Sequence, residues 1–205
     1  MTSDDFDHPS GRLPLAWQWN HNPDHRFWSL SERPGHLRLY TGRVVSSVLQ
    51  APNTLTQRTE GPTYRGVIEM DVRHMRPGDH AGLIALQSTF GTVGVRCLDE
   101  GKAVEMCVRG VHGGERIVEQ VPLPAGSVRL RIDFDFRESV DVARFYYALP
   151  GGEWRKIGWD LAMRYTLDHF MGYRVGLFCY AGREAGGYVD IDTFRYIRSA
   201  DLDLE

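Results

Sequence analysis

A chain of 205 residues, 42% hydrophobic and 25% charged, is long enough to bury a full hydrophobic core and has the composition of an ordinary folded domain. Its formal net charge of −3 excludes a general electrostatic attraction to nucleic acid or to an anionic membrane. No apolar run approaches the ~20 residues of a membrane span, and the polar N-terminus lacks the apolar core of a signal peptide. The sequence therefore predicts one cytoplasmic domain over residues 1–205, with an ordered core from about residue 4 to residue 198.

Apolar and polar residues alternate along much of the chain, which is typical of β-strands that bury one face. A first strand is expected at Phe6, and Val44 to Ala51 is the only early stretch that could form a short helix or an irregular crossing. The clearest strands are Tyr64 to Val72, with Tyr64, Ile68 and Met70 facing inward, and Ser127 to Arg137. His80 to Thr89 is nearly all apolar and is expected to be buried on both faces, and Thr92 to Arg109 is expected to form a hairpin. One turn of helix is expected at residues 166–171.

The last two predicted strands, within Tyr173 to Ile197, are joined by the glycine-rich segment Ala181 to Gly187. In the second of these strands, Val189 and Ile191 share one face, but Phe194 and Tyr196 fall on the other. A strand can bury both pairs against one core only if an extra residue shifts the register between them. We therefore predict a β-bulge near Asp192 or Thr193.

About a dozen strands at regular spacing, with almost no helix, predict an all-β fold of two packed antiparallel sheets. At this length a jelly roll of the concanavalin-A type fits better than an immunoglobulin-like domain, which needs only ~100 residues. Three of the five tryptophans lie between Trp17 and Trp28, and we expect Trp17 and Trp19 to fill the core rather than to stack on sugars. The three cysteines cannot all pair, so free buried thiols are expected.

Glu69 and Asp71 lie on the same face of one predicted strand, so their two carboxylates point the same way, about 7 Å apart. Jelly-roll β-glucanases carry the pattern E-x-D-x-x-E on such a strand, but the sixth position here is His74. The pair needed for retaining glycoside hydrolysis is therefore incomplete. The sequence favours a solvated charged face paired with Arg65 and Arg73, and an autonomous glycosidase using Glu69 and Asp71 is the alternative.

A second group of carboxylates joins the two ends of the chain. Asp4 and Asp5 lie at the start, and Asp190 and Asp192 lie in the last predicted strand. Carboxylate and carbonyl oxygens are the ligands that calcium prefers, so a structural calcium ion bound by Asp5 and Asp192 is predicted. The alternative is an aspartate that only caps the bulge.

Four stretches carry a family resemblance that extends from Asp4 to Ile197: WQWNHNPDHRFWSLSERPGHLRL, NTLTQRTEGP, DHAGLIALQSTFGTVGV and HFMGYRVGLFCYAGREAGGYVDIDTFRYI. They resemble the C-terminal β-sandwich of glycoside hydrolase family 43 β-xylosidases and xylosidase/arabinosidases. The resemblance implies a concanavalin-A-like jelly roll that packs on a five-bladed propeller. The catalytic residues of that family lie in the propeller, which this chain lacks.

The resemblance also implies an aromatic-bearing loop that leans toward the rim of the active site. By position, its counterpart here is the stretch around Phe178, Tyr180, Arg183 and Glu184, with Arg174 on the same face of the strand. These five residues are predicted to contact carbohydrate or the catalytic domain, and Phe178 and Tyr180 are expected to be exposed together. The predicted function is a non-catalytic module of a family 43-type glycosidase that acts on xylan-derived oligosaccharides. Its expected partners are a propeller domain, in cis or in trans, and a xylo-oligosaccharide.

Overall fold

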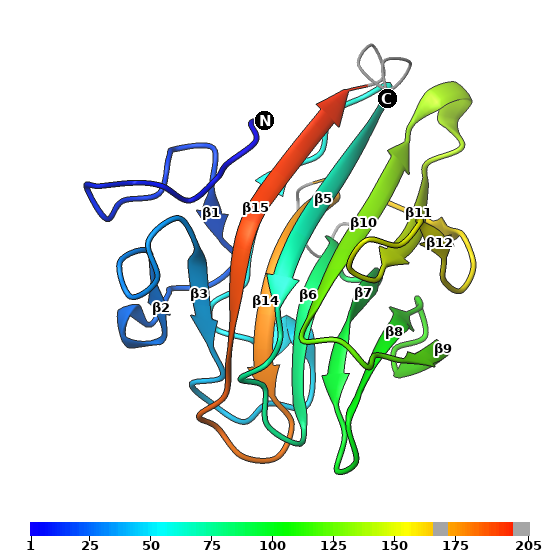
Figure 1. Ribbon diagram of the computed structural model, residues 1–205. Helices are drawn as coiled ribbons and strands as arrows, with labels where there is room; N and C mark the ends of the chain where they lie inside the picture. Colours follow the sequence, from blue (N-terminus) through cyan, green and yellow to red (C-terminus); the bar gives the residue numbers. More distant parts are fainter. Residues whose placement is uncertain (166–171, 199–205) are drawn as a thin grey trace.

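The alternating apolar residues form two antiparallel sheets in a computed structural model, which describes residues 1–165 and 172–198 (Figure 1). The predicted helical turn at residues 166–171 lies outside the described residues. In spatial order, the first sheet contains β1 (Gln18–Trp19), β4 (Leu55–Arg58), β14 (Arg174–Ala181), β6 (Asp79–Leu86), β7 (Phe90–Cys97), β8 (Lys102–Arg109) and β9 (Glu115–Pro122).

The second sheet contains eight strands. In spatial order these are β12 (Arg155–Lys156), β11 (Val142–Ala148), β10 (Ser127–Asp135), β5 (Thr63–Asp71), β15 (Tyr188–Arg198), β3 (Leu37–Tyr40) and β2 (Trp28–Ser29), with β13 (Leu161–Ala162) also paired to β11. The helical elements described are three single 3-10 turns: η1 (His25–Phe27), η2 (Val48–Gln50) and η3 (Arg137–Ser139). None of the helices in the described ranges is long or apolar enough to cross a membrane.

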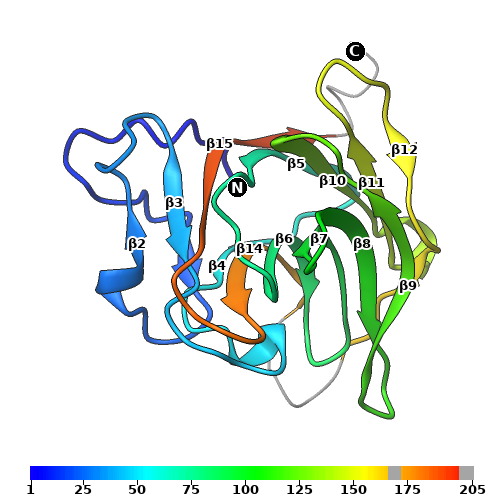
Figure 2. The ribbon, with the colours of Figure 1, turned by 60° about the horizontal axis from the view of Figure 1, so that its bottom comes forward.

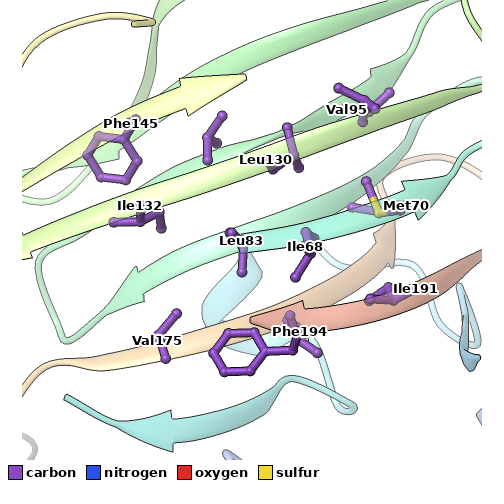
Figure 3. Packing of buried hydrophobic residues seen from close by; sticks show 14 of the residues in the cluster. Ile68, Met70, Leu83, Val95, Leu130, Ile132, Phe145, Val175, Ile191 and Phe194 are labelled. Atoms are coloured by element: carbon purple, nitrogen blue, oxygen red, sulfur yellow. The ribbon is translucent and has the colours of Figure 1, made fainter. Parts of the chain in front are cut away.

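The main core lies between the two sheets, which form separate layers in Figure 2. Ile68 and Met70 of β5 and Leu130 and Ile132 of β10 point into it from one side (Figure 3). Leu83 of β6 and other residues of the seven-stranded sheet meet them from the other side. The predicted two-sheet all-β fold is therefore confirmed, together with the inward faces of the two clearest strands.

The predicted bulge in the last strand is also confirmed. Between β15 and β5 the register shifts between Ile191 and Thr193, so that Asp192 is the extra residue. Val189, Ile191 and Phe194 are consequently all buried in the same core. The side chain of Asp192 stays half exposed, with His36 Nε2 3.8 Å from its carboxylate.

The two described ends of the chain meet through backbone hydrogen bonds. Asp4 and Phe194 form an isolated antiparallel bridge, each donating its N–H to the other's carbonyl at 2.8 Å. Phe6 is fully buried, but it has a left-handed backbone (φ 55°) rather than the extended strand conformation expected from the sequence. Trp17 is buried beside Phe6 and Phe194, as expected for a core residue.

Candidate contact site on the outer face of the seven-stranded sheet

The outer face of the seven-stranded sheet carries a second apolar cluster, which the loop of residues 44–51 covers. Val45 and Val48 of this loop pack against Ile84, Leu86 and Phe90 of β6 and β7, and against Phe178 and Tyr180 of β14. The loop is held by hydrogen bonds at both of its ends. The N–H of Val45 donates to the carbonyl of Ala181, and a 3-10 turn closes where Ala51 N–H donates to Val48.

Phe178 and Tyr180 are therefore buried, with exposed fractions of 4% and 8%. The expectation that the two rings form an exposed patch is wrong. The outer face of their strand does make a contact, but the partner is a loop of the same chain. Strand alternation separates the two faces of a strand and gives no information about a loop that crosses over one of them.

Beside this cluster lies a hollow of about 340 Å³, which we call the outer groove. Its floor is formed by β14, β6, β7 and β8, and the covering loop and the start of β9 rise at its sides. The hydroxyl of Ser47 on the loop donates to the carboxylate of Glu115 on β9, which links the two sides. Residues far apart in sequence are thus gathered around one small opening.

Polar side chains stand among the aromatic rings of the outer groove. The imidazole of His80 stacks on Tyr180, with ring centroids 4.8 Å apart and an interplanar angle of 4°. His80 Nδ1 lies 3.4 Å from a carboxylate oxygen of Glu105, and the amide of Gln120 donates to the other oxygen at 3.0 Å. Glu105 is 6% exposed, so its carboxylate is buried at the floor of the groove, where these two contacts fix its position.

The chemistry of the outer groove favours binding over nucleophilic catalysis. Burial, reinforced by Glu115 and Glu105, raises the pKa of the Cys107 thiol to about 12, so this cysteine stays protonated. Burial also raises the pKa of Tyr180 above its ordinary value. Neither group is ionised near neutral pH.

The other predicted contact residues lie outside the outer groove. Arg183 and Glu184 are exposed on the β14–β15 hairpin, and Arg183 pairs with Asp99 of the β7–β8 turn at 2.5 Å. Arg174 begins β14, six residues before Tyr180, and donates to Thr56 at 3.2 Å. At ~3.3 Å per strand residue it lies about 20 Å from Tyr180. The structure therefore gathers Phe178 and Tyr180 and separates them from the other three residues.

His80, Glu105 and Gln120 are the groove residues that the sequence reasoning missed. His80 and Glu105 each interrupt an otherwise apolar strand, and a charged or polar residue inside such a run is the signal that could have identified them. Gln120 gave no signal, because β9 is an exposed edge strand with weak alternation.

Glu69 and Asp71 lie on the outer face of the eight-stranded sheet, away from the outer groove. Burial works to raise the pKa of Asp71, but hydrogen bonds from Arg73 and Arg33 outweigh it and hold that pKa well below its usual value. Glu69 is exposed at the edge of a hollow that Arg129 and Trp154 also line. A general acid needs a raised pKa, so this pair is poorly suited to glycoside hydrolysis.

The carboxylates of Asp4 and Asp5, near the start of the chain, both accept hydrogen bonds from neighbouring groups. Asp4 is buried, and its carboxylate accepts hydrogen bonds from Trp17 Nε1 at 2.7 Å and from the Phe6 N–H at 2.8 Å. His8 Nε2 lies 2.7 Å from the same carboxylate. Asp5 is exposed and accepts from the Asp7 N–H. In residues 1–165 and 172–198 no three His, Cys, Asp or Glu side chains converge as a metal site. Two carboxylates fall short of the 6–8 oxygens that calcium takes, and a calcium ion at Asp5 and Asp192 stays a prediction.

The three cysteines carry no disulfide and are free, with Cys97 and Cys179 buried, as expected. Cys97 faces Lys102 across the β7–β8 hairpin and Cys107 faces Thr92, so the strand register keeps these two cysteines apart.

A two-layer antiparallel sandwich with this strand order defines the class of concanavalin-A-like modules. Residues 3–197 match the family of the β-xylosidase C-terminal concanavalin A-like domain, and the chain belongs to this C-terminal domain family of glycoside hydrolase family 43 (GH43).

Similar proteins agree with this assignment. A β-xylosidase of Formosa agariphila is 31% identical over 221 residues, which cover 95% of this chain and 35% of that protein. The structure of a bifunctional GH43-CE protein of Bacteroides eggerthii is 50% identical with a TM-score of 0.91, covering 95% of this chain and 25% of that one. The GH43 BlXynB protein of Bacillus licheniformis is 28% identical with a TM-score of 0.81, over 96% of this chain and 39% of that one. The chain thus spans between a quarter and two-fifths of these relatives.

Proposed function

We propose that this chain is a non-catalytic module that supports a GH43 propeller catalytic domain, in cis or in trans, in an enzyme acting on xylan-derived oligosaccharides. The observation that carries the proposal is the partial coverage of the relatives: the chain corresponds to their C-terminal domain and to no more than 39% of their length. Two of these relatives are named as a β-xylosidase and a bifunctional GH43-CE protein.

The exposed β14–β15 hairpin supports an interdomain contact in this proposal. Arg183 and Glu184 project from a turn whose base is fixed by Thr41, which accepts hydrogen bonds from the N–H groups of Gly186 and Gly187. Arg183 is further held by Asp99. A polar hairpin of defined shape is suited to the rim of an interface between domains, which is more polar than a hydrophobic core.

An autonomous glycosidase using Glu69 and Asp71 is the alternative, and the arginines around Asp71 argue against it. Arg73 and Arg33 favour the ionised form of this carboxyl, which removes a proton donor that the reaction requires.

We therefore expect the chain alone to release no nitrophenol from nitrophenyl xyloside or nitrophenyl arabinoside. The same assay on Glu69→Gln, which keeps the side-chain shape and removes the charge, is the matched control. Turnover by the wild-type chain that disappears in Glu69→Gln would contradict the proposal and establish the autonomous glycosidase.

A further inference from the structure

The outer groove contains a hydrogen-bonding group that the fold leaves unused. The hydroxyl of Tyr180 donates to no residue in the described part of the chain, although the side chain is more than nine-tenths buried and lines the groove. Its ring is fixed on both sides, by His80 at 4.8 Å and by Phe178 at 6.1 Å between centroids. The buried side-chain oxygens without a hydrogen-bond partner in the described residues are Tyr64 OH and Asp79 Oδ1, so the Tyr180 hydroxyl oxygen reaches solvent in the groove. It is therefore available to hydrogen-bond to a molecule that enters the groove.

The groups around this hydroxyl restrict the kind of ligand. The carboxylate of Glu105 keeps lone pairs beyond the bond from Gln120 and the contact with His80. Thr92 and Arg96 add a hydroxyl and a cation from β7. Two carboxylates, Glu105 and Glu115, against one guanidinium leave the groove with a net negative charge when His80 is neutral. An anionic ligand is therefore disfavoured, and a neutral molecule with several hydroxyl groups matches both the acceptors and the donors.

The volume of the outer groove sets the size of the ligand. About 340 Å³ lies at the small end of the range of ~300–1,000 Å³ for small-molecule pockets. Aromatic rings at the floor beside a few convergent polar groups are the usual lining of such pockets. The groove is thus suited to a terminal ring of a short oligosaccharide and too small for a protein segment.

We infer that the outer groove is a carbohydrate site that binds a neutral pentose ring at the end of a xylan-derived oligosaccharide, with Glu105 and the Tyr180 hydroxyl as its main hydrogen-bonding groups. The choice of sugar rests on the proposed function, whereas the choice of a neutral polyol rests on the groove itself. Tyr180 and Glu105 sit on strands β14 and β8, whose positions are fixed by continuous ladders, so the site is rigid before the ligand arrives.

The test is titration of the full chain with xylobiose, followed by ligand-observed NMR or calorimetry. The wild type is expected to bind with a dissociation constant in the millimolar range. Tyr180→Phe removes only the hydroxyl and is expected to weaken binding by about two- to tenfold, the range for one neutral hydrogen bond. Glu105→Gln removes the charge and is expected to weaken binding by about tenfold or more. Glucuronate, an anionic sugar, is expected not to bind.

Matched controls lie on the opposite sheet. Tyr146 lies under Arg131 on the outer face of the eight-stranded sheet, and Tyr146→Phe makes the same chemical change there with no expected loss of binding. Trp154, near Arg129 and Arg131, is the main competing aromatic platform on that face. Because Tyr180→Phe keeps the buried ring, its stability is expected to equal that of the wild type, and a denaturation curve checks this.

Three other results of the titration would contradict a sugar site in the outer groove. Binding that survives in Tyr180→Phe and Glu105→Gln but disappears in Trp154→Ala would move the sugar to the other sheet and leave the proposed function intact. Glucuronate binding as strong as xylobiose binding would contradict the charge argument. If xylobiose does not bind at tens of millimolar, the outer groove is not a sugar site. Support of a catalytic domain would still stand, because it is tested separately by the activity of that domain.

Discussion

Replacing Phe178 by alanine is expected to lower the free energy of unfolding by about 3–5 kcal/mol, the range for a fully buried phenylalanine. The ring is 4% exposed and forms the centre of the apolar cluster under the loop of residues 44–51. Gly94 provides the room for it, because a Cβ at that position would lie 3.2 Å from the end of the Phe178 ring. Alanine would leave a cavity that the fixed strands around it cannot close.

The measurement is urea denaturation at neutral pH, with Leu15→Ala as the control. Leu15 is 99% exposed, so its truncation is expected to change stability by less than about 0.5 kcal/mol. A loss below about 1 kcal/mol in Phe178→Ala would show that the covering loop does not bury this ring in solution.

Replacing Arg38 by alanine is expected to lower the free energy of unfolding by about 3 kcal/mol, because it strips a buried carboxylate of its main partner. Asp190 has a side chain only 2% exposed, and Arg38 binds it through two nitrogens at 2.7 and 2.9 Å. In this variant Arg33 still pairs with Asp190 at 3.1 Å. The expected loss therefore lies at the lower end of the range of about 3–5 kcal/mol for breaking a buried ion pair. Arg26→Ala, which breaks an exposed pair with Asp24, is the control and is expected to leave the unfolding midpoint unchanged.

The loss in Arg38→Ala is expected to depend on pH. Burial works to raise the pKa of Asp190, but hydrogen bonds from Arg38 and Arg33 outweigh it and lower the pKa below 3.8. When folding lowers the pKa of a carboxyl, the resulting stabilisation is complete at pH values above the pKa of the unfolded state. It is lost as the pH falls through the pKa of the folded state. The difference between wild type and Arg38→Ala should therefore be full at pH 7 and shrink below about pH 3.8. The guanidinium of Arg38 also lies over the Tyr188 ring, 4.1 Å from its centroid. A difference that stays constant down to pH 2.5 would show that this packing, and not the charge pair, is lost.

Much of the fold could be predicted from local patterns, because burial on one face of a strand leaves a period of two in the sequence. The bulge at Asp192 is an example. Ile191 and Phe194 are three residues apart, so a regular strand would place them on opposite faces, and the structure has the predicted register shift between them. The inward faces of β5 and β10 were predicted for the same reason.

The candidate site was harder to predict because it depends on contacts between distant segments. Phe178 and Tyr180 were correctly placed on the face opposite the main core, but the loop that buries them lies about 130 residues earlier in the chain. The edge strand β9 was missed, because its exposed residues carry little alternation, and with it the contact from Gln120 to Glu105. Local sequence separates the two faces of a strand, whereas the groove exists only once five strands and one loop are assembled.

If this chain supports a GH43 catalytic domain, adding it to such a domain that lacks its own C-terminal module should raise that domain's activity. The GH43 part of the Bacteroides eggerthii protein is a suitable recipient, since its counterpart of this chain is 50% identical. The measurement is the rate of nitrophenol release from nitrophenyl xyloside or arabinoside by the truncated domain, with and without the chain. We predict a rate that rises with the concentration of the chain and saturates, although the chain alone releases nothing. A rate that stays the same at every concentration of correctly folded chain would show that the chain does not support this catalytic domain.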